Sequence, residues 1–329
     1  MRATIKDVAK LAGVSPSTVT RVIQNSSAIS QKTKELVRKA MTDLNYHPNL
    51  NARSLVSSYT QVIGLVLPDD SDVFYQNPFF PTALRGISQV AADHNYAIQI
   101  STGKNEEQRL AAISQMVHGR RVDGLIFLYS KPDDPLVQLA VQHQFPFLIL
   151  GKAASPFISL VDNDNIQAGF EATTYFLNQG LHNIAFIAGN KELVVSQDRF
   201  EGYKNAIKAH NLPLDESKVK FVSGFLLEDS AYKIMKKLTK QQLDAIITTD
   251  SMVAEGVVRY LEEIGAKLPV LSFDSVKPKL PIAAYVDVHA IKLGRVAFTT
   301  LLQIINDSKE NKHVCYRRVI PHTITRLSH

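Results

Sequence analysis

The sequence predicts a small all-α helix-turn-helix domain followed by a large α/β core with parallel sheets. Two observations lead to this prediction. The first 60 residues hold short amphipathic segments separated by Gly and Ser-Pro turns, whereas apolar runs and helix-like segments alternate from residue 62 onward. Strands separated by helices form parallel sheets with helices on both faces. A core of about 270 residues is long enough for two doubly wound lobes.

The first helix is predicted over Ile5–Ala12. Thr4 and Asp7 have the spacing of a capping box, in which side-chain oxygens satisfy free N–H groups of the first turn. Gly13 can take the positive φ that ends a helix. Three apolar residues recur at helical spacing and indicate a small core: Ile5, Val8 and Leu11.

The second helix is predicted over residues 16–24, because Ser15 is a good N-cap and Pro16 suits the first helical position. Its apolar face consists of Val19, Val22 and Ile23. Its outer face carries hydroxyl groups and a guanidinium that can reach bases or phosphates: Ser17, Thr18, Thr20 and Arg21. This layout places one helix in the major groove of DNA, although any three-helix bundle shows similar spacing.

A third helix is predicted over residues 31–44, capped by Ser30. The segment after it, HPNLNARSLVSSYT, is too polar for a core strand, and Leu55 within it is an apolar residue without an obvious partner. Apolar side chains that enter the minor groove between base steps kink DNA. We therefore expect a helix-turn-helix domain over residues 1–47, a hinge helix or linker over 48–60 and the core over 61–329.

The charge distribution favours a nucleic-acid partner. Residues 1–60 hold nine Lys and Arg against three Asp and Glu, which gives +6. The whole chain has 37 against 31, also +6, so residues 61–329 hold 28 of each sign. A basic N-terminal domain on a neutral remainder is typical of DNA binding.

Other function classes lack the residues that they need. The single Cys315 excludes an intrachain disulfide, and the His residues stand at no metal spacing, so no metal is expected. The N-terminus is too polar for a signal peptide and no apolar run approaches the ~20 residues of a spanning helix, which favours the cytoplasm. Neither a GxxxxGKS/T phosphate loop nor a GxSxG nucleophile motif occurs, so we expect no cofactor and no enzyme.

The core shows eight apolar runs that predict strands: 62–67, 96–100, 124–128, 147–150, 184–188, 219–222, 245–248 and 270–273. Helix-like segments lie between them: 81–94, 106–117, 166–179, 197–209, 229–237 and 251–264. Ligands of such sheets bind beyond the carboxyl ends of the strands. Carboxylates follow the first, seventh and eighth runs: Asp69, Asp70, Asp250 and Asp274.

Further polar and aromatic side chains join these carboxylates. Arg199 stands near the start of a predicted helix, and Phe79 and Phe80 lie in an NPFF loop. Planar donors and acceptors with aromatic faces are what a carbohydrate site needs. A carboxylate at a strand end can equally cap the helix that follows, and Asp250 before Ser251 is the clearest example.

The chain resembles the lactose-repressor/galactose-repressor family from end to end. The motifs IKDVAKLAGVSPSTVTRVI, LNYHPNLNARSL, GLVLPD, NPFF, VDGLIF, RFEGY and SFDS follow the order of that family. Four segments are most similar in sequence to maltose-operon repressors of Gram-positive bacteria: LVSSYTQVIGLVLPDDSD, YQNPFFP, SPFISLVDNDN and AAYVD.

The resemblance implies a function for particular residues. Pro16, Ser17 and Arg21 match base-reading positions, and Ala52 and Leu55 match the minor-groove hinge. Pro16 has no hydrogen-bonding side chain, so readout there would be steric. The cleft positions of the family match ten residues: Asn77, Phe79, Phe80, Lys152, Asp162, Ser196, Arg199, Phe225, Asp250 and Asp274. Tyr75 is a further candidate for stacking on a sugar ring.

The resemblance also implies an architecture and a mechanism. The core would be periplasmic-binding-protein-like, with two lobes and chain crossings near residue 160 and within 290–320. A homodimer would bind a palindromic operator as a repressor, and maltose or a maltodextrin would release it. The alternatives are a catabolite-control-type regulator that answers to another sugar or to a phosphorylated carrier protein docked near Arg295, and a sugar-binding protein without DNA binding.

Overall fold

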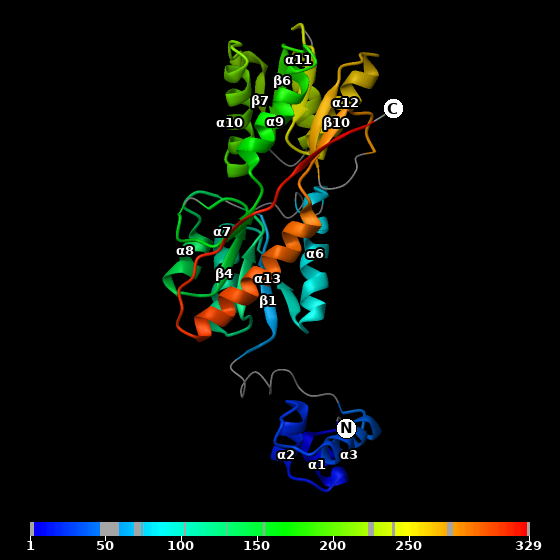
Figure 1. Cartoon of the computed structure of the whole chain (residues 1–329), viewed down its shortest axis with the longest axis vertical. Coiled ribbons are helices and arrows are strands. Elements are labelled where there is room, and N and C mark those ends of the chain that lie inside the picture. Colours follow the sequence, from blue (N-terminus) through cyan, green and yellow to red (C-terminus); the bar gives the residue numbers. More distant parts are fainter. Residues whose placement is uncertain are drawn as a thin grey trace. The chain divides into compact units, whose positions relative to one another are not determined.

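The computed structural model describes residues 3–46, 59–68, 74, 76–101, 103–129, 131–153, 155–222, 227–238, 241–274 and 279–327. The chain divides into two compact units, Met1–Thr60 and Gln61–His329 (Figure 1). Most of the predicted hinge lies outside the described residues, and so do several residues predicted to bind DNA or ligand: Ala52, Leu55, Asp69, Asp70, Tyr75 and Phe225.

The N-terminal unit contains the three predicted helices: α1 (Ile5–Ala12), α2 (Pro16–Ile23) and α3 (Gln31–Asp43). They pack around a small core of buried residues: Val8, Ala9, Val19, Val22, Val37 and Ala40. Helix α1 ends at Gly13, which has a φ of 65°, as its sequence position predicts. The Asp7 carboxylate accepts hydrogen bonds from the Thr4 amide at 2.9 Å and the Thr4 hydroxyl at 2.7 Å.

Leu11 departs from the predicted apolar stripe, because 54% of it is exposed. At about 100° per residue, Leu11 lies roughly 120° around the helix from Ile5. The buried face of α1 instead runs through Val8 and Ala9, with Ile5 and Ala12 packed partly against the same core. The spacing of Ile5, Val8 and Leu11 therefore identified the helix but assigned one residue to the wrong face.

The first lobe of the core is built on a six-stranded parallel sheet in the order β11-β5-β4-β3-β1-β2. Its strands are β1 (Val62–Val66), β2 (Ala97–Ile100), β3 (Gly124–Phe127), β4 (Phe147–Leu150), β5 (Leu160–Asp162) and β11 (Arg317–Val319). Helices α6 (Phe79–Asp93) and α13 (Ala290–Lys309) pack together on one face. Helices α7 (Glu106–His118) and α8 (Pro135–Gln142) contribute to the core on the other face.

The second lobe repeats this plan with the sheet order β12-β10-β9-β8-β6-β7. Its strands are β6 (Ile184–Ala188), β7 (Val219–Phe221), β8 (Ala245–Thr248), β9 (Val270–Asp274), β10 (Ala284–Asp287) and β12 (Thr323–Arg326). Only β12 runs antiparallel to its neighbour among the described pairs. Helices α9 (Asn165–Leu177) and α10 (Val194–Ala209) cover one face, and α11 (Leu227–Leu238) and α12 (Ser251–Glu263) the other.

The chain passes between the lobes at three places in the described core: from β5 to α9, from β10 to α13 and from β11 to β12 (Figure 1). Strands β5, β10, β11 and β12 belong to these crossings, and none of them was among the predicted apolar runs. They are only three or four residues long and carry charged residues such as Arg317 and Arg318. Their pairing depends on distant parts of the chain rather than on local pattern.

Four predicted helix starts in the core are late by one to three residues, and two of them, those of α6 and α10, concern residues predicted for the site. Helix α6 begins at Phe79 rather than residue 81, because the Asn77 side-chain oxygen accepts from the Phe79 amide at 3.0 Å and organises the first turn. Phe79 and Phe80 therefore belong to a helix and not to a loop. Helix α10 begins at Val194, so Arg199 lies in its second turn rather than at its start.

Helices α6 and α13 approach each other closely at two glycines. A Cβ on Gly86 would lie 2.1 Å from the Ile291 carbonyl oxygen, and one on Gly294 would lie 2.1 Å from the Ala83 carbonyl oxygen. The backbones of both helices therefore meet without intervening side chains. In the described parts of the chain, no helix combines the length and apolar character that a membrane crossing requires.

Candidate functional site

A cavity of about 440 Å³ lies between the two lobes. Its lining comes from the carboxyl ends of strands in both sheets: Tyr129 after β3, Lys152 after β4, Gly189 after β6 and Asp250 after β8. This is the edge at which parallel α/β sheets bind ligands. The volume is within the range of small-molecule sites, which is roughly 300–1,000 Å³.

The cavity brings together nine of the ten residues predicted for an effector: Asn77, Phe79, Phe80, Lys152, Asp162, Ser196, Arg199, Asp250 and Asp274. The tenth, Phe225, lies outside the described residues. The structure adds lining residues that the sequence reading missed: Tyr129, Asn163, Asn165, Thr249 and Phe273. Tyr129, Thr249 and Phe273 stand at or just after the end of a predicted strand, so inspecting every predicted strand end would have found them. Asn163 and Asn165 follow β5, which the sequence did not predict.

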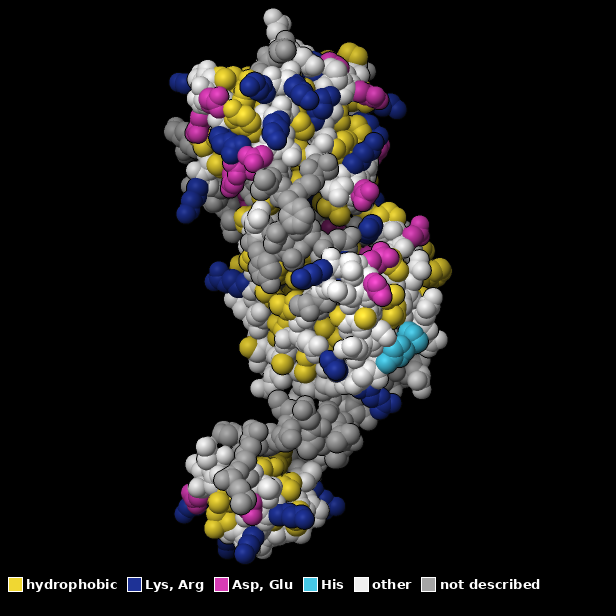
Figure 2. Space-filling view, turned by 180° about the vertical axis from the view of Figure 1, so that it is seen from behind, with side chains coloured by type: hydrophobic (Ala, Val, Ile, Leu, Met, Phe, Trp, Pro, Cys, Tyr) yellow, Lys and Arg dark blue, Asp and Glu magenta, His cyan; other side chains and the backbone are white. Residues whose placement is uncertain are grey.

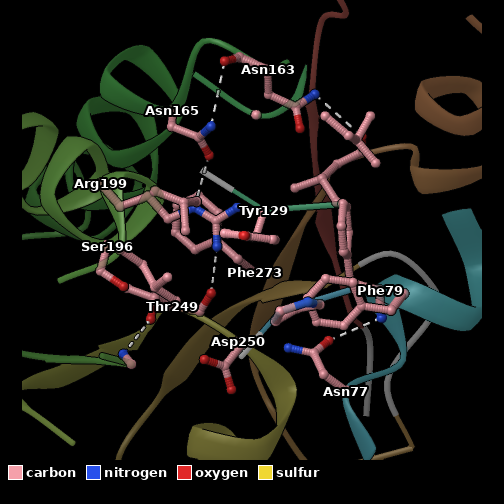
Figure 3. A pocket seen from close by; sticks show the side chains of 18 of the residues that line it. Asn77, Phe79, Tyr129, Asn163, Asn165, Ser196, Arg199, Thr249, Asp250 and Phe273 are labelled. Carbon is pink, nitrogen blue, oxygen red and sulfur yellow. Dashed lines mark hydrogen bonds between the residues drawn. The ribbon is translucent and has the colours of Figure 1, made fainter. Parts of the chain in front are cut away.

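Arg199 is held in the wall of the cavity by contacts on several sides. Its Nε donates to the Asn165 side-chain oxygen at 2.9 Å, its Nη1 donates to the Thr249 carbonyl, and its guanidinium lies 4.1 Å from the centre of the Phe273 ring (Figure 3). Burial lowers the pKa of Arg199 to about 10, against the opposing effect of nearby carboxylates, Asp250 foremost. The group therefore keeps its charge at neutral pH and its orientation is fixed.

Asp250 both caps a helix and lines the cavity. One carboxylate oxygen accepts from the Val253 amide at 3.0 Å, which satisfies the first turn of α12. Burial raises the pKa of Asp250, while hydrogen bonding to Val253 and the charge of Arg199 act in the opposite direction. The helix-capping prediction for this residue is thus correct, and its carboxylate is also close enough to Arg199 for the two charges to affect each other's pKa.

Asp162 stands at the end of β5, where the chain first leaves the first lobe. Its carboxylate accepts from the Asn163 amide at 2.8 Å and from the Asn165 side-chain nitrogen at 3.0 Å. Burial raises the pKa of Asp162 to about 7, and the charge of Asp198 adds to this effect. Asp162, Asn165 and Arg199 therefore form a continuous chain of hydrogen bonds along the cavity wall.

Lys152 reaches across the cavity mouth to the other lobe. It follows β4 in the first lobe, and its Nζ lies 2.9 Å from both carboxylate oxygens of Asp198 on α10. The resemblance implied that Lys152 contacts an effector. The structure places its ammonium group in an ion pair between the lobes, and the residue also lines the cavity.

Asn163, in the first crossing, forms hydrogen bonds to the other two crossings. Its side-chain nitrogen donates to the Val288 carbonyl at 3.2 Å and to the Ile320 carbonyl at 2.8 Å. Asn163 is in the first crossing, Val288 in the second and Ile320 in the third. The residue is buried and also lines the cavity, so a ligand in the cavity would touch the point where all three crossings meet.

The aromatic and polar groups together suit a polyhydroxylated ligand. Phe79, Phe80, Tyr129 and Phe273 offer apolar faces, and fixed carboxylates, amides and a guanidinium offer paired donors and acceptors. Ser196 is buried on α10 and adds a hydroxyl to the lining. Across the described ranges, no group of three or more His, Cys, Asp or Glu side chains is placed to hold a metal ion.

The N-terminal unit presents the predicted DNA-contacting residues on α2. The Ser15 hydroxyl accepts from the Thr18 amide at 3.2 Å and lies 2.7 Å from the Ser17 hydroxyl. The Thr20 hydroxyl donates to the Pro16 carbonyl at 3.1 Å. Thr18 and Thr20 are half-buried rather than fully on the outer face, whereas Arg21 is exposed in the last turn. Lys and Arg side chains are spread over the face of this unit visible in Figure 2.

Comparisons with known proteins agree with both parts of this description. Residues 4–49 match the family described as bacterial regulatory proteins, lacI family, and residues 60–324 match periplasmic binding proteins and sugar binding domain of LacI family. The chain is 65% identical to the HTH-type transcriptional regulator MalR of Streptococcus pneumoniae over 326 residues, which cover 98% of this chain and 99% of that protein. These relatives are named as regulators of transcription and not as enzymes.

Two solved structures are similar over most of the chain. A probable maltose operon transcriptional repressor from Staphylococcus aureus is 25% identical with a TM-score of 0.73, covering 82% of this chain and 98% of that one. A complex of the transcriptional regulator CelR with cellobiose is 26% identical with a TM-score of 0.73, covering 98% of both chains. The chain therefore belongs to the lacI family of bacterial regulatory proteins, with a DNA-binding helix-turn-helix domain and a two-lobed α/β core.

Proposed function

We propose that this regulator is a homodimeric repressor of maltose or maltodextrin utilisation genes and leaves its operator when the sugar binds between the core lobes. The observation that carries the proposal is the cavity, in which nine residues expected from the sequence surround one space with aromatic faces and fixed polar groups. One similar protein is described as a probable maltose operon repressor, and another is in complex with cellobiose, also a disaccharide.

The DNA half of the proposal rests on α2. Ser15, Pro16, Ser17, Thr18 and Thr20 lie at or within its first two turns, and Arg21 extends from its last turn. A dimer with two such helices would read a palindrome, because the two-fold axis of the protein coincides with that of the operator. Ala52 and Leu55 remain proposed minor-groove contacts. The cytoplasm, where the operator is, is the expected compartment.

The coupling between sugar and DNA is proposed to pass through the lobes. A sugar in the cavity would contact residues of both lobes and the crossing residue Asn163 at once. It would therefore favour one lobe arrangement over others, and with it one spacing of the DNA-binding units in the dimer. A hundredfold change in operator affinity needs about 2.7 kcal/mol of differential binding, which is usual for coupled sites.

The test is operator binding by fluorescence anisotropy at fixed salt, with and without maltose. The DNA is a palindromic operator from upstream of maltose-utilisation genes. Tight binding that maltose abolishes supports the whole proposal. Tight binding that ignores maltose keeps the DNA-binding regulator but moves the effector to another sugar or to a phosphorylated carrier protein. An absence of binding to any palindrome upstream of sugar-utilisation genes would contradict the operator assignment.

A further inference from the structure

The cations of the interlobe cavity are already engaged by the protein itself. Lys152 is bound to both carboxylate oxygens of Asp198 at 2.9 Å. Arg199 donates to Asn165 and Thr249. Lys131, the third cation in the lining, is exposed and also has an interaction partner. Each of the three described cations in this lining therefore already has a partner within the protein.

The carboxylates of the lining outnumber these cations. Four acids contribute to the lining: Asp162, Glu192, Asp250 and Asp274. Against three cations this gives three minus four, a formal charge of −1 when every carboxyl group is ionised. Burial raises the pKa of Asp162 to about 7, so a further negative charge nearby would make its ionised form still less favourable. An anionic ligand would meet a site that is short of positive charge.

Helix N-termini offer an anion little compensation here. Five helices begin at the cavity, α6, α9, α10, α11 and α12, and a helix N-terminus is a common phosphate site. The Asp164 carboxylate caps α9 by accepting from the Gln167 amide at 2.9 Å, and the first turn of α11 carries Glu228 and Asp229. In the first turn of α12, the Val253 amide already donates to the Asp250 carboxylate at 3.0 Å. In the first turn of α6, the Phe79 amide already donates to the Asn77 side-chain oxygen at 3.0 Å. Helix α10 has no side-chain cap, but the carboxylate of Glu192 precedes it and also lines the cavity.

We infer that the cavity selects an uncharged sugar and rejects its phosphorylated form. This inference rests on the proposed sugar-sensing function and names the chemical class of the effector. The hydroxyl groups of a neutral sugar can bond to carboxylates such as Asp250 and to amides such as Asn77 without adding charge (Figure 3). A phosphate dianion would have to lose its hydration in a site whose described lining holds an excess of acids.

The experiment is calorimetric titration of the full-length protein with matched neutral and phosphorylated sugars at constant ionic strength. The pairs are maltose and maltose 6'-phosphate, trehalose and trehalose 6-phosphate, and glucose and glucose 6-phosphate. For the sugar that binds, we expect its phosphorylated form to bind at least about 100-fold more weakly. If that sugar is not maltose, the maltose assignment fails while this inference stands. A phosphorylated form that binds as tightly as its neutral partner, or a panel in which nothing binds, overturns it.

A variant can relax the selectivity in a defined direction. Asp198→Asn removes the negative charge that pairs with Lys152, a lysine of the cavity lining. We expect the ratio between the dissociation constants of the phosphorylated and the neutral sugar to fall about tenfold in this variant. Asp215→Asn is the matched control, because Asp215 is an exposed carboxylate paired with Lys218 outside the lining. Equal selectivity in the parent and Asp198→Asn would show that paired cations are not the cause.

Discussion

Lys152 and Asp198 form an ion pair across the mouth of the cavity. The Lys152 Nζ lies 2.9 Å from both Asp198 oxygens, and the two side chains are 43% and 13% exposed. One partner follows a strand of the first lobe, and the other stands on α10 of the second. The pair therefore stabilises the lobe arrangement in which the proposed sugar contacts surround one space. Because Lys152 is partly exposed, its contribution is modest, on the order of 1 kcal/mol.

Replacing this lysine should weaken sugar binding. Lys152→Met keeps a similar length but loses the charge, so the lobe arrangement described here becomes less populated. We expect a two- to fivefold loss of affinity, which corresponds to about 1 kcal/mol or less. The loss should shrink at high salt, because salt screens the pair only in the parent. Titration calorimetry with the sugar at low and high salt measures both effects.

The control for this variant lies on α10, the helix that carries Asp198. Lys204 pairs with Glu201 within α10, so Lys204→Met removes the ion pair of a similarly exposed lysine, 36% against 43%, that does not join the lobes. Its sugar affinity should equal that of the parent at every salt concentration. If Lys152→Met also behaved like the parent, the pair across the cavity would contribute nothing to binding.

Asn163 should be essential for the stability of the crossings. Asn163→Asp preserves the shape of the side chain but removes the two donated hydrogen bonds and places oxygen against the carbonyls of Val288 and Ile320. We expect the free energy of unfolding of the core to fall by about 1–3 kcal/mol. Urea unfolding measures it. Asn178→Asp, at an exposed helix end, should change stability by less than about 0.5 kcal/mol. Equal effects of both substitutions on the free energy of unfolding would show that the hydrogen bonds of Asn163 do not stabilise the crossings.

The sequence predicted the N-terminal helices well because their signals are local. Ser15 and Ser30 cap their own helices, and Gly13 ends one, so each boundary depends on a few neighbouring residues. The apolar runs of the core were equally readable, since strands buried on both faces carry continuous apolar residues. The crossing strands were not, because β11 contains two arginines and is held by pairing with β5 far away in the sequence.

The cavity shows the same division between local and distant information. The strand-end rule and the family resemblance placed residues such as Asp250 and Asp274 in one site. They did not reveal that Lys152 would bind Asp198, or that Asn163 would bond to Val288 and Ile320. Those contacts join residues from different crossings or lobes, and only the folded chain brings them together.

Arg21 should read a base and not only neutralise phosphate. It is exposed in the last turn of α2, where a guanidinium can donate two hydrogen bonds to guanine. Arg21→Ala should cost about 1–3 kcal/mol in operator affinity and relax the preference at one base pair of each half-site. Anisotropy titrations against a set of operators with single substitutions measure both. An equal loss on every DNA sequence would instead identify a phosphate contact.

A second arginine provides the control for that experiment. Arg38 is on α3, and its Nη2 donates to the Asn25 side-chain oxygen at 3.3 Å. Arg38→Ala removes the same charge from the same small domain but from α3, and it leaves the side chains of α2 unchanged. We expect a smaller loss of affinity that does not depend on the operator sequence. A change in base preference with this variant would show that residues outside α2 contact the bases.

Asp162 should make the stability of the core depend on pH. Its pKa is about 7 in the folded protein against an ordinary value of 3.8, mainly because of burial. Between these two values the folded state keeps a proton that the unfolded state has lost, so the contribution of Asp162 to stability falls as pH rises and is constant above about pH 7. Asp162→Asn has no such proton. Relative to the parent, its free energy of unfolding should therefore increase from pH 4 to pH 7 in urea titrations.

Asp215→Asn should show no such trend, because the pKa of Asp215 is lowered by its hydrogen bonds from Ser217 and Lys218. Parallel pH profiles for the parent and Asp162→Asn would mean that Asp162 is ionised in the folded protein throughout this range.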